Sequence, residues 1–259
     1  MLATDDSILN EKRISHLVDQ MAYLKSKGIN ILLVSSGAVA SGRKIMPCHK
    51  RTDPVSSRQL WASIGQVKLI QTYSEFFEKH NIFCSQVLVT KEDFRDRQHF
   101  LNIRNCLETL LDHNILPIIN ENDVVSVTEL MFTDNDELAG LITSMMNTDA
   151  MIIVSNVDGV YDGPPNNPKS SVIPVIEQDF SNISKFISAE KSNFGRGGMI
   201  TKFGIAKKVA LSGTPVHLIN GMRENILIDI IENKADAIQT FFSPGKKTSP
   251  IKKIAAASF

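Results

Sequence analysis

The sequence has little cysteine, no long apolar run and no excess of charge. Its cysteines, Cys48, Cys84 and Cys106, are odd in number and show no C-x-x-C spacing, which argues against a disulfide framework or a zinc site. No apolar stretch approaches the roughly 18 residues that a membrane-spanning helix needs, and nothing near Met1 resembles a signal peptide. The 28 basic residues are balanced by 28 acidic ones, so no positive field is available to bind nucleic acid. We therefore expect a soluble, cytoplasmic protein that binds neither membranes nor nucleic acid.

Familiar nucleotide-binding and nucleophile motifs are also missing. Neither G-x-x-x-x-G-K-[ST] nor G-x-G-x-x-G occurs, so P-loop and Rossmann chemistry lack their usual support. The six histidines show no pairing with serine or cysteine in a nucleophile motif, and we interpret them as structural or surface residues. Any phosphate binding must therefore use a different arrangement.

What the sequence does contain is an alternation of helical patterns with short apolar runs, in a composition of 42% hydrophobic and 22% charged residues that is typical of globular proteins. Apolar residues from Ile14 to Leu24 recur at helical spacing, the pattern closes at Gly28, and a buried-strand pattern runs from Ile29 to Val34. The alternation continues with predicted helices at 57–79, 98–113, 136–146 and 201–212 and predicted strands at 83–90, 116–120, 151–155 and 216–220. This order predicts a doubly wound, mainly parallel α/β sheet with helices on both faces, which binds ligands beyond the carboxyl ends of its strands.

Polar clusters follow three of these predicted strands, at 35–38, 120–123 and 155–159. Ser36-Gly37-Ala38 offers a hydroxyl and backbone N–H groups to an anion, although an ordinary capped turn would look the same. The carboxylates of Glu121 and Asp123 would need a cationic or hydrogen-bonding partner if they were buried, and a surface turn is the alternative.

Two more segments combine polar or small residues at the start of a predicted helix. Thr133-Asp134-Asn135-Asp136 is richer in polar groups than a helix cap requires. The stretch from Phe194 to Lys202 is a glycine-rich loop that leads into a helix. Its glycines allow close approach to a phosphate and its lysine supplies a point charge, while a flexible surface loop is the alternative.

Taken together and in this order, these segments resemble the amino-acid kinase family, and within it the members that phosphorylate free glutamate. The residues that carry the resemblance are Ser35–Arg43, Gly65-Gln66, Pro117–Asp123, Phe132–Asp136 and Gly195–Lys202, and it runs almost from end to end. It implies a three-layer α/β/α sandwich that binds glutamate and MgATP over the carboxyl edge of the sheet. The implied reaction is the ATP-dependent phosphorylation of the γ-carboxylate of L-glutamate, the first step of proline biosynthesis. A homo-oligomer, a dimer or a tetramer, is expected.

The resemblance also assigns roles to individual residues. Lys202 would neutralise charge on the transferred phosphoryl group, and Asp136 would hold catalytic lysines in position. The glutamate-binding residues would be Ser36, Gly37, Ala38, Asp123 and Asn135. The nucleotide-binding residues would be Ser155, Asn156, Asp158, Gly159, Tyr161, Gly195, Gly197, Gly198 and Met199. Many relatives have Asp in place of Asn156, and Mg²⁺ would be bound through the nucleotide phosphates without a protein metal site.

The family pattern differs from this chain at both ends. Family members open with a strand that carries a Lys-x-Gly-Ser/Thr motif, and Met1–Thr4 aligns with the segment just after that strand. The resemblance therefore implies that the first phosphate-binding lysine is absent and that the chain as written has little or no kinase activity. Residues 1–242 are expected to form the kinase domain. Residues 243–259 would be a tail or a linker toward an absent PUA domain, a fold associated with RNA binding.

Two alternatives remain open. The chain could be another amino-acid kinase, such as one resembling acetylglutamate kinase, although Asp123 is better suited to an unacylated amine. It could instead be a non-catalytic sensor, which would bind glutamate without needing MgATP.

Overall fold

The computed structural model describes residues 11–47, 53–126, 132, 134–165, 167–178, 198–246 and 254–258. The described residues up to Phe132 form one compact unit, and those from Asp134 to Ser258 form a second. In this part of the chain, no helix is long and apolar enough to cross a membrane. Polar clusters lie at strand ends in both units.

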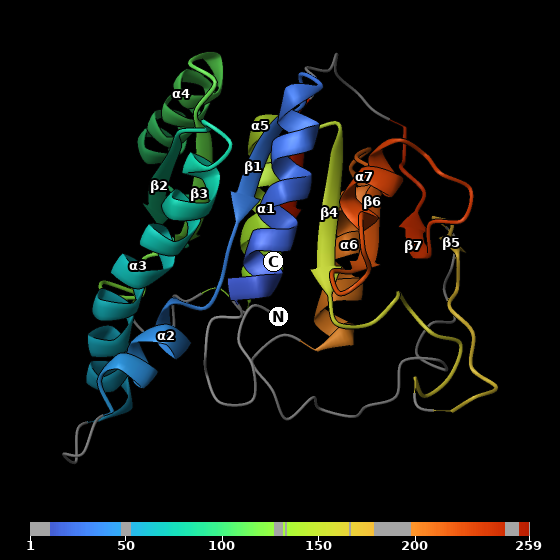
Figure 1. Ribbon diagram of the computed structural model, residues 1–259, viewed down its shortest axis with the longest axis horizontal. Helices are drawn as coiled ribbons and strands as arrows, with labels where there is room; N and C mark the ends of the chain where they lie inside the picture. The colour runs from blue at the N-terminus through green and yellow to red at the C-terminus, as the bar shows by residue number, and fades with distance from the viewer. Residues whose placement is uncertain are drawn as a thin grey trace. The chain divides into compact units, whose positions relative to one another are not determined.

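The first unit is a parallel sheet with helices packed on it (Figure 1). Its strands are β1 (Asn30–Val34), β2 (Cys84–Val89) and β3 (Leu116–Glu121), in the order β2-β3-β1. Its helices are α1 (Glu11–Ser26), α2 (Ala38–Ile45), α3 (Pro54–Glu78) and α4 (Arg97–Asp112). Helices α1 and α3 pack against each other. In addition, α1 packs against β1, α3 against β2 and α4 against β3.

The elements of this unit follow from local sequence. Ile14, Leu17, Val18 and Met21 form the buried face of α1, and Gly28, at φ 80°, turns the chain into β1. Asp53 caps α3 by accepting hydrogen bonds from the N–H groups of Val55 and Ser56, at 2.9 and 3.0 Å. The predicted starts and ends of these elements are therefore close to the observed ones.

The second unit has a mixed sheet. Its strands are β4 (Ala150–Ser155), β5 (Val175–Ile176), β6 (Val216–Asn220), β7 (Gln239–Phe242) and β8 (Ile254–Ser258), in the order β8-β4-β6-β7-β5. Its helices are α5 (Asn135–Met146), α6 (Met199–Leu211) and α7 (Ile226–Ile231). Strand β4 is parallel to β6 and β8, and β7 is antiparallel to β6. Helix α5 packs against α6 and β4, and α7 packs against β6.

The helices and strands that the sequence predicts are all present, with ends that shift by a few residues. The sequence patterns do not predict α7, β5, β7 or β8, and they give only a turn where α2 begins, because these segments are short or irregularly apolar. Within residues 243–259, Ile254–Ser258 forms β8 and pairs with β4. The proposed domain boundary at residue 242 stays a prediction.

Candidate active site

In the first unit, the polar clusters after β1 and β3 lie at one edge of the sheet. The two strands are parallel and Val34 pairs with Ile119, so the residues that follow β1 and β3 begin next to each other at the carboxyl ends of the strands. The backbone N–H of Ser35 extends the ladder by donating to the carbonyl of Ile119 at 3.0 Å. Gly37 then adopts φ 107°, which a side chain would disfavour, and Ala38 begins α2. The turn predicted at Ser36-Gly37-Ala38 is therefore present, and it leads directly into α2.

Packing beneath this turn fixes its position. The hydroxyls of Ser35 and Tyr73 are 2.9 Å apart, and burial raises the pKa of Tyr73, so its phenol stays neutral.

Helices α2 and α3 cross in close contact because both carry glycine at the crossing. A Cβ at Gly42 would lie 1.8 Å from the carbonyl oxygen of Trp61, and one at Gly65 would lie 1.7 Å from that of Ala38. Any larger residue at either position would force the two helices apart.

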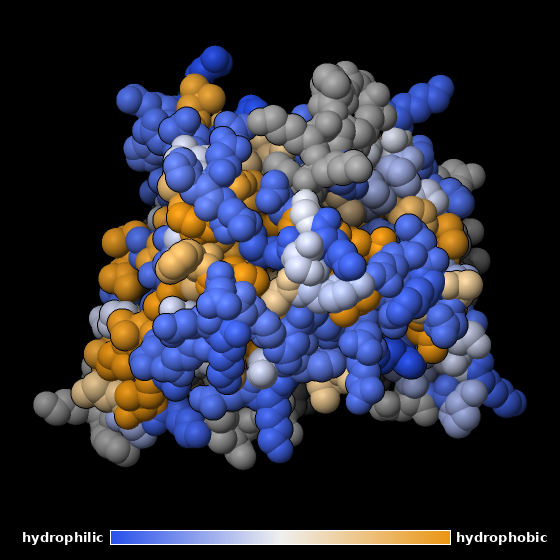
Figure 2. All heavy atoms as spheres, turned by 45° about the horizontal axis from the view of Figure 1, so that its top comes forward, coloured by the Kyte–Doolittle hydropathy of each residue, from blue (hydrophilic) through white to orange (hydrophobic). Residues whose placement is uncertain are grey.

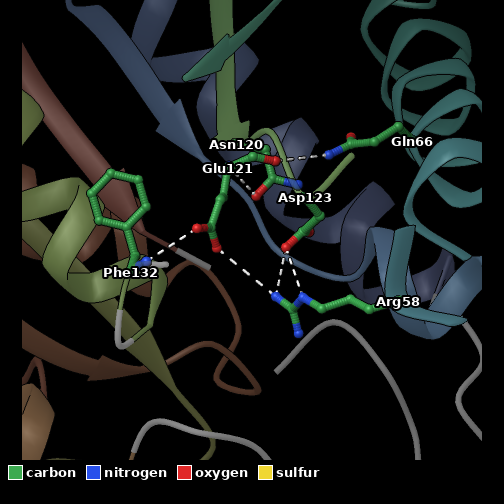
Figure 3. A network of polar contacts seen from close by, with 6 residues as sticks. All are labelled: Arg58, Gln66, Asn120, Glu121, Asp123 and Phe132. Carbon is green, nitrogen blue, oxygen red and sulfur yellow. Dashed lines mark hydrogen bonds and ion pairs between the residues drawn. The ribbon is translucent and has the colours of Figure 1, made fainter. Parts of the chain in front are cut away.

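The carboxylates of Glu121, the last residue of β3, and of Asp123, two residues later, are buried and both lie beside one arginine (Figure 3). Arg58, from the start of α3, donates from Nε and Nη2 to Oδ1 of Asp123, at 3.0 and 2.6 Å. The same Nη2 lies 3.8 Å from Oε2 of Glu121. Oε1 of Glu121 accepts a hydrogen bond from the backbone N–H of Phe132 at 3.0 Å. Glu121 and Asp123 are only 5% and 6% exposed, so they are not the surface turn that the sequence left open.

Amide side chains hold the backbone of this cluster. Gln66 donates from Nε2 to the carbonyl of Glu121 at 3.4 Å, and its Oε1 accepts from Gln86 at 3.1 Å. Oδ1 of Asn120 accepts from the N–H of Glu121 at 2.9 Å. Because the backbone and one oxygen of Glu121 are both bonded, its carboxylate has a fixed position.

In the second unit, the acidic block divides into a cap and an ion pair. Asp134 is the N-cap of α5 and accepts from the N–H of Glu137 at 3.0 Å. Burial and the charge of Asp136 raise the pKa of Asp134. Asp136, 4% exposed, forms an ion pair with Lys202 of α6, with 2.6 Å between Oδ2 and Nζ. The structure thus brings together the two residues that the sequence assigned to catalysis. Thr133 lies outside the described residues.

The segment after β4 is held by an arginine that sequence reasoning did not select. Arg223 donates from Nε and Nη2 to the two carboxylate oxygens of Asp158, at 2.7 and 2.9 Å, and Asn220 donates to Oδ1 at 2.8 Å. The hydroxyl of Tyr161 is 3.4 Å from Oδ2. The hydrogen bond from Arg223 lowers the pKa of Asp158 to about 2. Asp158 therefore ties the loop after β4 to the loop after β6.

The remaining predicted nucleotide-binding residues are positioned by backbone packing. The backbone at Gly159 is so close to Thr240 that a Cβ there would lie 2.4 Å from the Thr240 hydroxyl oxygen. Ser155, at the end of β4, donates to Oδ1 of Asn156 at a long 3.5 Å. Gly198 is the N-cap of α6 and Met199 is its first residue. Gly195 and Gly197 lie outside the described residues.

The structure thus gathers the predicted residues into two sets, one in each unit. Ser36, Gly37, Ala38 and Asp123 lie at one sheet edge of the first unit, while Asn135, Asp136 and Lys202 lie together in the second. The assigned roles stay predictions. Arg58 was missed because it is 65 residues from Asp123 in sequence, although the need of buried carboxylates for a cation pointed to such a residue. Over the described ranges, no group of three or more His, Cys, Asp or Glu could hold a metal ion.

Comparison with known families adds an independent finding. The model of the amino acid kinase family matches residues 4–220. The chain is 50% identical over 259 residues to the glutamate 5-kinase of Bacteroides thetaiotaomicron, covering 100% of this chain and 72% of the relative. It is 50% identical over 214 residues to that of Chlorobaculum tepidum, covering 83% and 59%, so it spans little more than half of that relative. With the glutamate 5-kinase of Alkaliphilus metalliredigens, identity is 39% over 249 residues and coverage is 95% and 92%.

Solved structures confirm the fold class. The isopentenyl phosphate kinase of T. acidophilum, in a product complex, aligns with a TM-score of 0.63 at 13% identity, covering 93% of this chain and 95% of that one. An isopentenyl phosphate kinase in a substrate complex aligns with a TM-score of 0.61 at 16% identity, covering 93% and 96%. The expected three-layer α/β/α architecture with a mainly parallel sheet is therefore correct.

Proposed function

The chain belongs to the amino acid kinase family, and from this premise we propose that it is built to phosphorylate the γ-carboxylate of L-glutamate at the expense of ATP. The product would be glutamyl 5-phosphate, an intermediate of proline biosynthesis. The observation that carries the proposal is the ion pair of Lys202 with Asp136, at 2.6 Å. It fixes a cation directly after the glycine loop, where a phosphoryl group would be transferred.

The reaction needs charge neutralisation more than it needs a base. The γ-carboxylate of glutamate is ionised at neutral pH and is itself the nucleophile, so no side chain has to remove a proton. Two anions must instead be brought together, and the rate depends on positioning and on nearby cations. Lys202 has this role in the proposal, with Asp136 orienting its ammonium group. Mg²⁺ bound to the nucleotide phosphates would supply further positive charge.

Asp123 favours a free amino acid as the acceptor. A buried carboxylate pairs well with an ammonium group, whereas an N-acylated substrate offers only a neutral amide at that position. We assign glutamate binding to Ser36, Gly37, Ala38, Asp123 and Asn135. We assign nucleotide binding to Ser155, Asn156, Asp158, Gly159, Tyr161, Gly195, Gly197, Gly198 and Met199.

Equilibrium binding tests the proposal without depending on turnover. Calorimetry should show L-glutamate binding with a dissociation constant at least tenfold lower than that of N-acetyl-L-glutamate. Binding of N-acetylglutamate in preference to glutamate would favour the acetylglutamate kinase alternative. Glutamate binding that is unaffected by an ATP analogue would favour the sensor.

The surface of the first unit supports a homo-oligomer as part of the proposal. Val67 of α3, Phe83 before β2 and Leu101 of α4 are 64%, 80% and 47% exposed. Figure 2 shows hydrophobic side chains on the side of the molecule where α3 and α4 lie in Figure 1. Contiguous patches of exposed apolar side chains often mark protein–protein interaction sites. Light scattering after size-exclusion chromatography should give at least twice the mass of 28.7 kDa for one chain.

A further inference from the structure

The loop after β4, to which the proposed function assigns nucleotide binding, is anchored by its backbone only at its two ends. Ser155 is the last residue of β4, and its carbonyl accepts a hydrogen bond from the N–H of Gly221 at 3.0 Å. Further on, the N–H of Val160 donates to the hydroxyl of Thr240 at 2.8 Å. Between these anchors, no backbone–backbone hydrogen bond joins residues 156–158 to another part of the chain that the structure describes. The position of this segment therefore depends on its side chains.

Asp158 is the side chain that ties the segment down. Its Oδ1 accepts from Nε of Arg223 at 2.7 Å and from Nδ2 of Asn220 at 2.8 Å, and its Oδ2 accepts from Nη2 of Arg223 at 2.9 Å. The hydroxyl of Tyr161, 3.4 Å from Oδ2, is a longer fourth donor. A carboxylate has about four lone-pair sites, so those of Asp158 are taken up by the protein itself.

Arg223 is in turn held at the end of the neighbouring strand. Strands β4 and β6 are parallel, and Ser155 pairs with Asn220, the last residue of β6. Oδ1 of Asn220 accepts from the N–H of Met222 at 3.0 Å, and its carbonyl accepts from the N–H of Arg223 at 3.1 Å. The backbone of Arg223 is thus fixed in a turn, while its side chain, 41% exposed, reaches across to the loop after β4. Because the guanidinium is planar and binds both oxygens of Asp158, it fixes the direction of the carboxylate as well as its distance.

The ion pair of Arg223 with Asp158 therefore restrains a loop that has few other restraints. A loop already held in its binding conformation binds a ligand more tightly, because less of its motion has to be lost on binding. We propose that Arg223 is a positioning residue for the nucleotide: its ion pair with Asp158 holds residues 156–158 in the position from which the loop binds ATP. Asp158 then acts on the nucleotide through the loop and is not itself a ligand of the ribose. This inference rests on the nucleotide binding that the proposed function assigns to the loop.

Two alternatives would give one of these residues a direct contact with the nucleotide. A carboxylate beyond the end of a strand can accept a hydrogen bond from a ribose hydroxyl, and the effect of removing its charge would then depend on that hydroxyl. The guanidinium of Arg223 could instead bind a phosphate, and it would then contribute to binding even without Asp158. If the two residues act only as a pair, neither dependence is expected.

Calorimetry with MgATP and no glutamate tests the proposal on the whole chain without a phosphoryl acceptor present. Arg223→Gln and Asp158→Asn should each weaken ATP binding by about three- to fivefold, the upper range for a partly exposed ion pair. The double variant should lie within about twofold of either single variant, since the ion pair can be lost only once. Arg223→Lys keeps a cation for Asp158 and should bind ATP more tightly than Arg223→Gln. In Asp158→Asn, 2′-deoxyATP should lose affinity by the same factor as ATP.

Controls separate loop positioning from loss of structure. Lys234→Gln removes the cation of another exposed ion pair in the second unit, 2.7 Å from Asp229, and should leave ATP affinity unchanged. Glutamate affinity should be unchanged in Arg223→Gln, because the ion pair involves none of the residues assigned to glutamate. Thermal unfolding identifies any variant that does not fold, and Arg223→Lys is the milder change if Arg223→Gln is one of them.

Several outcomes would overturn the proposal. Unchanged ATP affinity in Arg223→Gln, or an Arg223→Lys variant that binds no more tightly than Arg223→Gln, would show that the ion pair does not position the loop. Losses that multiply in the double variant would indicate separate contacts with the nucleotide, and a smaller loss for 2′-deoxyATP than for ATP in Asp158→Asn would make Asp158 a ribose ligand. Each of these results leaves the proposed function intact, since wild type still binds ATP. Absence of ATP binding by wild type would instead overturn both.

Discussion

The close crossing of α2 and α3 leads to a strong prediction for Gly65→Ala. The added Cβ would lie 1.7 Å from the carbonyl oxygen of Ala38, where ordinary van der Waals contact begins near 3.4 Å. The clashing atom belongs to the backbone and cannot rotate away, so the helices must separate by more than about 1 Å. Overpacking of this kind costs about 1–3 kcal/mol or more, and better helix propensity offsets about 1 kcal/mol of that. We expect a net loss of about 2 kcal/mol in the free energy of unfolding.

Gly204→Ala is the matched control. Gly204 lies inside α6, is exposed, and has nothing within 4 Å of the position of an added Cβ. The same substitution there should stabilise the protein by about 0.5–1 kcal/mol, because only helix propensity changes. Urea unfolding followed by circular dichroism measures both variants. If Gly65→Ala were as stable as wild type, the close packing of α2 on α3 would be wrong.

Gly65→Ala should also weaken glutamate binding, because α2 begins at Ala38, directly after the turn assigned to the substrate. The loss of affinity should exceed that of Gly204→Ala in the same calorimetric assay. Equal affinities in the two variants would show that the position of this turn does not matter for the ligand.

Three further predictions concern charged residues of the second unit. Because Arg223 lowers the pKa of Asp158 to about 2, this pair stabilises the protein above the unfolded pKa of 3.8 and ceases to do so as the pH falls from about 4 to about 2. Asp158→Asn should therefore have a free energy of unfolding about 1 kcal/mol lower than wild type at pH 6. In urea titrations, this difference should shrink as the pH falls from about 4 to about 2. Burial raises the folded pKa of Asp134, so its ionised carboxylate opposes folding above that pKa. Asp134→Asn removes this charge and still caps α5, so it should be at least as stable as wild type at pH 7. Asp134→Ala removes the cap as well and should lose about 1 kcal/mol in the free energy of unfolding. Lys202→Met leaves the charge of Asp136 buried and should lower the free energy of unfolding by about 2 kcal/mol. Asp136→Asn leaves only a partly exposed lysine and should cost less. Urea unfolding that gave the opposite order would contradict this reasoning.

The order of the helices and strands could be read from the sequence because it is encoded locally. The 3.6-residue apolar pattern of Ile14–Leu24 and the buried run at Ile29–Val34 are short-range features, and they predicted α1 and β1 with ends within a few residues of the observed ones. Short elements such as β5 and α7 have too few residues to show a period. The strand β8 depends on pairing with β4, which no local pattern reports.

The residue types of the candidate site were likewise evident, but their partners were not. Sequence showed that Glu121 and Asp123 follow a buried strand, that Asp136 starts a helix, and that a lysine follows a glycine loop. It could not show that Arg58 bridges two of these carboxylates, or that Arg223 engages Asp158, because these contacts join segments 65 residues apart in the chain. Helix capping and apolar periodicity depend on neighbours in sequence, whereas burial of polar groups and ion pairs between loops depend on which strands lie side by side. The sequence alone therefore determined the elements and the chemistry available at their ends, and only the tertiary structure decided which charges meet.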